Sequence, residues 1–332
     1  MDLKLLKALS EAVCIGHLTE ARDLAKAEFE KYAAVTHFGQ SGLIAKIDNG
    51  KDKTLLLDAH IDEVGFIVTA VLGEGFLRVA SVGGNDARIL PATPVTVHGK
   101  EKITAVFASV PPHLSGGDKE VKGLDDIVLD TGRADVENLV SAGDLVTYKA
   151  DFAKLSGNKI TGKSFDDRAG VFCLIELAKR VYDKDIPYNL VFSVSEGEEL
   201  GTRGAITATF ANEANEAIAI DVSFGDAPDI STDKCGKLGS GAMLGISPVL
   251  DRGVTARLKN IATNKNIPVQ FEVMGGRTST DADVISVSKS GVKTGLLSIP
   301  LRNMHTPAEI IDTADLESLI CLLEEYVLGG GN

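Results

Sequence analysis

The sequence predicts an α/β protein: a three-layer α/β/α sandwich with a mostly parallel sheet, interrupted by an inserted small β-barrel domain. Two observations support this prediction. Short apolar runs alternate with amphipathic stretches in the outer parts of the chain, as in a largely parallel sheet covered by helices. Between them lies a stretch rich in Val and Thr, punctuated by Gly and Pro, with almost no helical periodicity, which is typical of a small all-β module.

Residues 1–66 are expected to form the first part of the α/β domain. Apolar positions recur at helical spacing from Leu3 to Ala33 and predict two helices that are broken near Gly16. Two short apolar runs, GLIAKID at 42–48 and KTLLLDA at 53–59, predict neighbouring strands.

Residues 67–161 are expected to form the inserted barrel, because runs such as FLRVASVGG and KITAVFASV are separated by turn residues. Residues 162–332 are expected to complete the α/β domain. The elements predicted there are a helix at 168–183, strands at 188–195, 217–223, 268–274 and 294–300, and a closing helix over LESLICLLEEYVL at 316–328.

Size and charge limit the classes of function. The 332 residues suit about two domains. A net charge of −13 and a pI near 5.0 argue against nucleic acid or anionic membrane as partner. The four cysteines form no Cys-x-x-Cys pair, which argues against a thiolate zinc site. The first residues carry charges throughout and do not resemble a signal peptide, so we expect a cytoplasmic protein.

Histidines and carboxylates stand where several predicted strands end. Two more carboxylates stand directly before a predicted helix. In open α/β sheets, ligands bind outside the carboxyl ends of the strands. These residues are His60 and Asp62 after the strand at 53–59, Glu196, Glu198 and Glu199 after 188–195, Asp221 in 217–223, His305 after 294–300, and Asp166 and Asp167 before the helix at 168–183. Five segments therefore direct carboxylates or imidazoles to one edge of the sheet.

Each of these residues has an ordinary alternative. A single histidine at a strand end is commonly a surface residue, and the adjacent Glu198 and Glu199 would suit a solvated loop. Asp166 and Asp167 would ordinarily cap the helix that follows them. Asp221 is harder to explain, because a carboxylate that ends an apolar strand is costly without a partner. All of these ordinary alternatives would have to be true at the same time, so we favour the interpretation that the residues form one functional site.

The chemistry of the set favours metal. Two histidines and several carboxylates, without cysteine, suit a divalent ion such as Zn²⁺, Co²⁺ or Mn²⁺. Crowded carboxylates repel one another, and two divalent ions would balance them. Such a pair shares a bridging carboxylate and activates a water. The neighbours Glu198 and Glu199 allow one to bind metal while the other takes the proton from that water.

Five motifs carry a resemblance to a known family. LDAHIDEVGF, KSFDDRAG, SEGEELGTRGA, AIDVS and NMHTPAE occur in this order. In order and spacing they resemble the glutamyl-aminopeptidase-like metallopeptidases, which are the TET or deblocking aminopeptidases, some of them formerly labelled cellulases. The resemblance covers nearly the whole chain. It implies an α/β catalytic domain interrupted by a β-barrel dimerisation domain, and homo-oligomers that are often dodecamers.

The resemblance also implies roles for individual residues. Glu198 would be the general base, and Asp62 would accept a hydrogen bond from His60 and orient its ring. The choice of Asp166 over Asp167 as the bridging ligand depends on aligning the Arg-Ala-Gly that follows. The implied metal ligands are His60, Asp166 and Asp221 for one ion, and Asp166, Glu199 and His305 for the second.

Two segments depart from the family pattern. The stretch around Cys14 lacks the usual Ser-Gly-x-Glu, and Arg277 stands where relatives continue with Gly-Thr-Asp. Thr280 and Asp281 still match that element, so recognition of the substrate amine by this segment stays open. No implied ligand or base position departs.

The function that we expect is hydrolysis of N-terminal residues from peptides, by a metal-bridging water that Glu198 activates. A related metal-dependent amidohydrolase or deacylase shares much of this chemistry. An endoglucanase-type glycoside hydrolase would need two carboxylates but no histidine and no metal. The chain has no Trp and only 5% aromatic residues, so it offers few platforms for stacking sugars. A non-catalytic scaffold that binds metal for stability is the remaining alternative.

Overall fold

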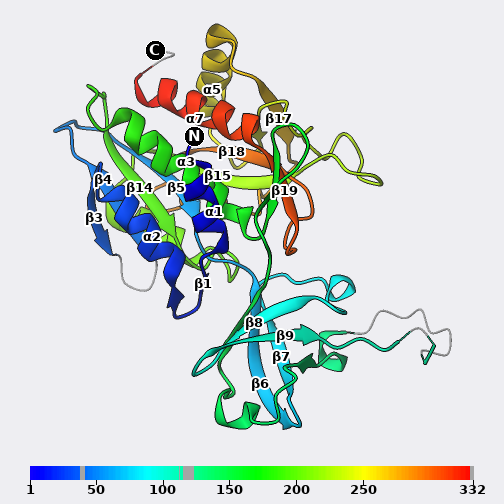
Figure 1. The fold of residues 1–332 in the computed structure, drawn as a ribbon. Helices are drawn as coiled ribbons and strands as arrows, with labels where there is room; N and C mark the ends of the chain where they lie inside the picture. The colour runs from blue at the N-terminus through cyan, green and yellow to red at the C-terminus, as the bar shows by residue number, and fades with distance from the viewer. Residues whose placement is uncertain (38–41, 112, 115–122, 330–332) are drawn as a thin grey trace.

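The computed structural model describes residues 1–37, 42–111, 113–114 and 123–329. An α/β sandwich and a separate β-barrel make up the molecule, and the barrel lies below the sandwich in Figure 1. The predicted fold class, a sandwich interrupted by an inserted barrel, is confirmed. Among the described residues, no helix combines the length and the apolar character that a membrane span requires.

An eight-stranded sheet forms the middle layer of the sandwich. Its central strands β18, β15, β5 and β14 are parallel to one another. On one side of this group β16 runs antiparallel to β18, and on the other side β4 runs antiparallel to β14. The order across the sheet is β17 (Val269–Val273), β16 (Ala242–Ile246), β18 (Lys293–Leu301), β15 (Glu216–Phe224), β5 (Thr54–His60), β14 (Asn189–Ser195), β4 (Gly42–Ile47) and β3 (Ala34–His37). The carboxyl ends of the four central strands therefore share one edge.

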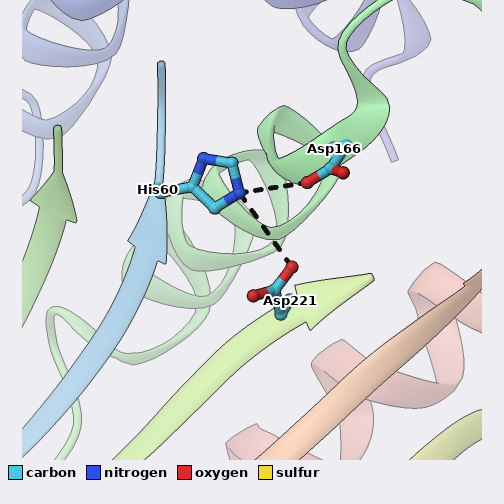
Figure 2. A group of neighbouring side chains, drawn as sticks. All are labelled: His60, Asp166 and Asp221. Atoms are coloured by element: carbon cyan, nitrogen blue, oxygen red, sulfur yellow. Dashed lines mark hydrogen bonds and ion pairs between the residues drawn. The ribbon is translucent and has the colours of Figure 1, made fainter. Parts of the chain in front are cut away.

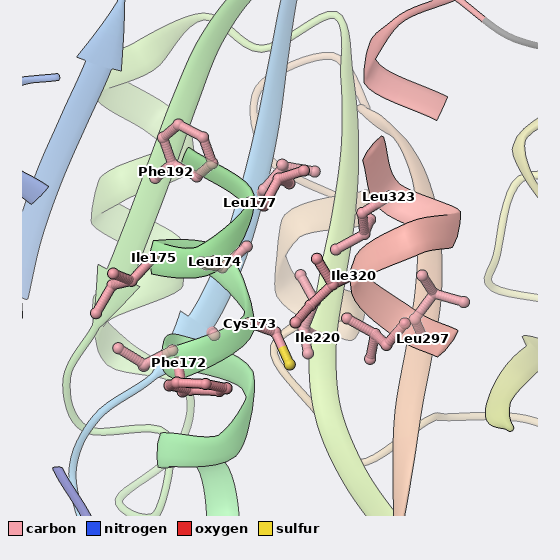
Figure 3. Close-up of a cluster of buried hydrophobic side chains, with 14 of the residues drawn as sticks. Phe172, Cys173, Leu174, Ile175, Leu177, Phe192, Ile220, Leu297, Ile320 and Leu323 are labelled. Atoms are coloured by element: carbon pink, nitrogen blue, oxygen red, sulfur yellow. The ribbon is translucent and has the colours of Figure 1, made fainter. Parts of the chain in front are cut away.

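Helices cover both faces of this sheet. One face carries α1 (Leu3–Glu11), α2 (Glu20–Phe29), α3 (Phe165–Val181), α5 (Arg252–Lys265) and α7 (Thr313–Val327), and the other carries α4 (Arg203–Asn212) and α6 (Ala282–Ser286). The middle of the first face is α3, which is buried along nearly its whole length. Figure 3 shows Phe172, Leu174 and Leu177 of α3 in one buried apolar cluster with Ile220 of β15 and Ile320 of α7. Each such side chain contributes about 1.5–3 kcal/mol when fully buried.

Six strands close the barrel in the order β10-β7-β6-β11-β8-β9. Burial alternates along β9 (Lys102–Phe107), as expected where one face of a strand points inward. Inside, the ring of Phe66 packs edge-on against Phe107 and Tyr148, with centroids 4.9 and 5.5 Å apart. The other bounds are β6 (Gly65–Gly73), β7 (Phe76–Val82), β8 (Pro94–His98), β10 (Leu129–Asp130) and β11 (Leu145–Tyr148), with 3-10 helices η1 (Ala87–Ile89), η2 (Leu124–Asp126) and η3 (Val136–Asn138).

Two small sheets complete the fold. The predicted break near Gly16 is the turn between β1 (Cys14–Ile15) and β2 (Leu18–Thr19), where Gly16 has a φ of +55°. The second sheet joins β12 (Ala153–Lys154), β13 (Lys159–Gly162) and β19 (Glu309–Asp312). It ties the segment that returns from the barrel to the C-terminal part of the chain. The division of the chain at 66/67 and 161/162 stays a prediction.

Candidate metal centre

The first group of candidate ligands lies at the carboxyl edge of the sheet. β5 and β15 are paired as far as Asp58 and Ala219, so two residues later they bring His60 and Asp221 to the same edge. Nε2 of His60 lies 3.0 Å from Oδ1 of Asp166 and 4.0 Å from Oδ1 of Asp221 (Figure 2). All three residues are buried. We call His60, Asp166 and Asp221 the buried group.

The second group shares Asp166 with the first. Nε2 of His305 lies 3.1 Å from Oδ2 of Asp166 and 3.2 Å from Oε1 of Glu199. We call Asp166, Glu199 and His305 the half-buried group, because the His305 side chain is 30% exposed. Within each group the ligand atoms lie within 4.8 Å of one another. The two oxygens of Asp166 thus face different histidines, which is the arrangement that a bridging carboxylate requires.

The structure separates the roles of Asp166 and Asp167. Both residues have non-helical dihedrals at the start of α3. Asp167 points its carboxyl into the helix, where Oδ1 accepts the backbone N–H of Gly170 at 3.1 Å, as an N-terminal cap does. A Cβ at residue 170 would lie only 2.3 Å from this carboxylate, so a larger residue there would displace it. Asp167 caps the helix and Asp166 is left to face the histidines.

Asp62 holds the loop that carries the two adjacent glutamates. Its Oδ1 accepts the backbone N–H of Glu198 at 3.2 Å, and its Oδ2 accepts that of Glu199 at 3.3 Å. The predicted contact with His60 is longer, because Nδ1 of His60 lies 3.5 Å from Oδ1 of Asp62, beyond ordinary hydrogen-bond length. Nδ1 of His60 has no hydrogen-bond partner among the described residues. Asp62 therefore orients the Glu198–Glu199 backbone more directly than the His60 ring.

The barrel contributes a contact to the half-buried group. Nδ1 of His305 lies 2.8 Å from the carbonyl oxygen of Gly84, in the loop after β7. A carbonyl oxygen can only accept, so Nδ1 carries the proton and donates it. The lone pair of Nε2 is then directed towards Asp166 and Glu199. This is how a metal-binding histidine is commonly oriented.

Burial and crowding disfavour negative charge at several carboxyl groups. Burial raises the pKa of Asp221 well above its usual range, although His60 lies close by. Burial also raises the pKa of Glu198 to about 7. For Asp166 burial acts in the same direction, but hydrogen bonds with His305 and His60 outweigh it and hold the pKa below its usual range. Bound cations would favour the ionised forms of all these groups.

The donor set suits a borderline divalent ion. Each group offers one imidazole nitrogen and two carboxylates, which Zn²⁺, Co²⁺ and Mn²⁺ accept. Three carboxylates lie within reach of only two histidines. The raised pKa values of Asp221 and Glu199 reflect burial and, for both, the nearby Asp166 charge. The residues therefore fit a pair of cations.

Two cavities lie beside the adjacent glutamates Glu198 and Glu199. One of about 960 Å³ is lined by Glu198, Arg277 and Thr280, among others. Another of about 800 Å³ is lined by Cys14 and Glu199, among others. The adjacent glutamates thus open onto different spaces. Both segments that depart from the family pattern line these cavities.

Sequence reasoning missed a buried charge cluster beneath the site. Glu63 contacts Arg168 at 2.7 Å and also pairs with Lys163. Burial would raise the pKa of Glu63, but Arg168 and Lys163 outweigh it and lower the pKa to about 2. Arg168 also donates to the carbonyl oxygen of Leu9 at 2.9 Å and so fastens α1 to the site. The only available signal was position, since Glu63 and Arg168 lie inside the motifs HIDE and FDDRAG.

Known proteins resemble this chain along nearly its whole length. It is 29% identical to the lysyl aminopeptidase of Pyrococcus furiosus, over 98% of this chain and 97% of that one. A TET aminopeptidase from the marine sediment archaeon Thaumarchaeota archaeon SCGC AB-539-E09 superposes with a TM-score of 0.92, at 28% identity over 98% of this chain and 95% of that one. The TET1 peptidase of Pyrococcus horikoshii, which can assemble into a tetrahedron or a large octahedral shell, superposes with a TM-score of 0.86, at 31% identity over 98% and 99%. The family model for M42 glutamyl aminopeptidase matches residues 41–322, and the chain belongs to this family of peptide-bond hydrolases.

Proposed function

We propose that the two groups hold two divalent cations that share Asp166, and that Glu198 is the general base of an aminopeptidase. The observation that carries this proposal is the position of Asp166. One of its oxygens lies 3.0 Å from His60 and the other 3.1 Å from His305. Bound cations would polarise the scissile carbonyl and lower the pKa of an attacking water.

The residues of the chain divide the remaining work. Glu199 belongs to the half-buried group, whereas Glu198 is in neither group and lines the 960 Å³ cavity. Glu198 would take a proton from the attacking water and return it to the leaving amine. A carboxyl group whose pKa lies near 7 is suited to both transfers. Asp62 holds the Glu198 backbone in place through its hydrogen bond at 3.2 Å.

The proposal extends to the substrate, the metal and the assembly. Peptides with a free N-terminus are the proposed substrates, and zinc, cobalt or manganese the proposed metals. We propose a homo-oligomer, because the TET1 peptidase of Pyrococcus horikoshii, which is 31% identical to this chain, can assemble into a tetrahedron or a large octahedral shell. A dodecamer built from dimers is the specific expectation. A cytoplasmic location stays a prediction from the sequence.

Metal analysis combined with a substrate panel tests the function. The purified protein should contain about two divalent ions per chain and hydrolyse aminoacyl-nitroanilides, and a chelator should abolish this activity. Activity on polysaccharide that survives the chelator would instead indicate a glycoside hydrolase. Two bound ions without hydrolysis of any substrate would indicate a scaffold. Cleavage of N-acyl groups in place of N-terminal residues would indicate a deacylase.

The variant Glu198→Gln tests the general base. We expect kcat to fall by a factor of about 10²–10⁴, because the proton has no acceptor. Glu198 is outside both groups, so the metal content should remain that of the wild type. Near wild-type turnover with intact metal would show that another residue is the base.

A further inference from the structure

A buried carboxylate outside both groups touches the backbone of two of their residues. Glu309 begins β19 and is 2% exposed. Its Oε1 accepts the backbone N–H of His305 at 3.0 Å. Its Oε2 accepts the N–H of Phe165 at 2.6 Å and that of Asp166 at 3.3 Å. One side chain therefore binds two segments that are far apart in the sequence.

These contacts matter most where the backbone is unusual. His305 has a φ of +60°, in the left-handed region that non-glycine residues rarely adopt. Asp166 has non-helical dihedrals although it stands at the start of α3. The left-handed conformation of His305 needs support from the surrounding structure. Glu309 contacts the backbone of both residues at once, one oxygen for each.

The side chain of Glu309 is not needed to place its own strand. β19 pairs with β13 through four residue pairs, of which Gly162–Glu309 is one. The backbone N–H of Ile310 also donates to the carbonyl oxygen of Arg302. Because these bonds involve backbone atoms only, a change in the side chain of residue 309 should leave the strand in place.

We propose that Glu309 is a positioning residue that sets the separation of His305 from Asp166 and thereby the geometry of the half-buried group. The proposal rests on the proposed function, since it assumes that this group holds a cation. The buried group should depend on Glu309 less, because only Asp166 of its members contacts Glu309. Loss of the contact should therefore weaken one metal site more than the other.

Two substitutions separate the effect of the negative charge of Glu309 from the effect of its side-chain length. In Glu309→Gln one oxygen becomes an NH₂ group, which would face a backbone N–H and cannot accept from it. Glu309→Asp keeps both acceptors but shortens the side chain by one methylene. Asp315→Asn is the matched control. Asp315 is also a buried carboxylate, and it accepts the N–H groups of Gly239 and Gly241 at 2.8 and 2.7 Å, outside both groups.

The experiment measures metal stoichiometry and affinity by titration against a competing chelator, together with kcat, KM and Tm. For Glu309→Gln we expect one cation to bind as in the wild type and the second to bind about 10–100-fold more weakly. The kcat should fall at limiting metal and recover partly when metal is in excess. Glu309→Asp should lose less affinity, and Asp315→Asn should lower Tm with both affinities unchanged.

Different results would overturn different conclusions. Two cations bound by Glu309→Gln with wild-type affinities, together with a lower Tm, would show that Glu309 is only structural. Equal weakening in Asp315→Asn would attribute the effect to general destabilisation and would also overturn the proposal. If Glu309→Gln does not fold, wild-type metal affinities in Glu309→Asp would overturn it. A wild-type protein that binds no cation would instead refute the proposed function itself.

Discussion

The buried and the half-buried group share one carboxylate but are built in different ways. His60 ends β5, and Asp221 lies near the carboxyl end of the adjacent parallel strand β15, so the register of the sheet places them. Glu199 and His305 come from loops. Their positions depend on contacts from outside the group, namely with Asp62, with Gly84 and with Glu309. The geometry of the buried group is thus set by the core, and that of the half-buried group by the contacts around it.

This difference has a physical consequence. Side chains at the ends of core strands cannot move unless the packed sheet moves, whereas loop residues can shift when a single hydrogen bond is lost. The ring of His305 is also 30% exposed, while that of His60 is 2% exposed. We therefore expect substitutions around the half-buried group to reduce activity by different amounts. Loss of Asp166, which both groups share, should reduce it most.

The largest effect should come from the residue that belongs to both groups. Asp166→Asn removes the negative charge that both histidines face. We expect loss of both cations and a fall in kcat/KM of about 10³-fold or more. Asp167→Asn is the matched control, because asparagine also caps helices well and should leave metal content unchanged. Retention of two cations by Asp166→Asn would show that Asp166 does not bridge them.

Asp62→Asn should have a smaller effect that is confined to the half-buried group. The N–H groups of Glu198 and Glu199 bond to different oxygens of Asp62, and asparagine puts an NH₂ group in place of one of these oxygens, so one of the two N–H groups loses its acceptor. We expect kcat to fall about 10–100-fold while one cation remains tightly bound. Asp130→Asn serves as control, since Asp130 is an exposed barrel residue whose side chain accepts the N–H of Gly132. Equal loss of both cations in Asp62→Asn would contradict the difference between the groups.

Gly84→Ala tests whether the barrel contributes to the site. A Cβ at residue 84 would lie 3.1 Å from Nδ1 of His305, so the ring would have to move by a few tenths of an ångström. We expect kcat to fall about threefold, with Tm almost unchanged. The control is Gly123→Ala, where a Cβ would meet no atom of the described residues within 4 Å. Unchanged kinetics in both variants would mean that the Gly84 contact is dispensable.

The smallest expected effect is a change with pH in the Tm of the metal-free protein. Burial raises the pKa of Glu198 from 4.5 to about 7. A carboxyl group with a raised pKa holds its proton more tightly when folded, so its ionisation lowers stability as pH rises from 4.5 to about 7. We therefore expect Tm of the metal-free protein to fall across this interval. Added metal should raise Tm more at about pH 7.5 than at about pH 5, because protons compete with cations.

Two comparisons check this pH dependence. In Glu198→Gln the slope of Tm against pH should be smaller, because one titrating carboxyl is gone. Glu63, whose pKa is lowered to about 2, should not contribute to the slope in this interval. Its stabilising contribution is constant above pH 4.5 and is lost only as the pH falls below that value. If the Tm of the metal-free protein instead rises between about pH 5 and pH 7, the conclusion that burial raises the pKa of carboxyl groups at this centre would be contradicted.

Much of the fold could be predicted because its signals are local. β4, β5, β14, β15 and β18 fall on stretches predicted as strands, since each is a short apolar run of the kind that forms a buried strand. β16 and α4 were not predicted, because their sequences, AMLGI and RGAITATFAN, carry little periodicity of their own. Their positions depend on neighbours, as when Ala205 and Ala208 of α4 pack against the sheet.

The supporting contacts of the site were beyond sequence reasoning. Asp62 was expected to orient His60, and that role stays a prediction, with Nδ1 of His60 3.5 Å from Oδ1 of Asp62. The hydrogen bonds that Asp62 accepts from the Glu198–Glu199 backbone were not expected. Nothing in the motif HIDE indicates which way this side chain turns. The same holds for Glu309 in HTPAE and for Gly84, which lies in the loop after a barrel strand.

The class of the fold followed from the sequence alone, because periodicity is a property of short stretches, and residue chemistry was enough to propose the ligands and the five segments that carry them. Folding in three dimensions was needed to show that Asp166 faces two histidines while Asp167 caps a helix, and that Glu309 joins Asp166 to His305. The reason is geometric. A side chain's partner depends on the direction of its bonds and on segments distant in the chain, and these are set only when the layers pack.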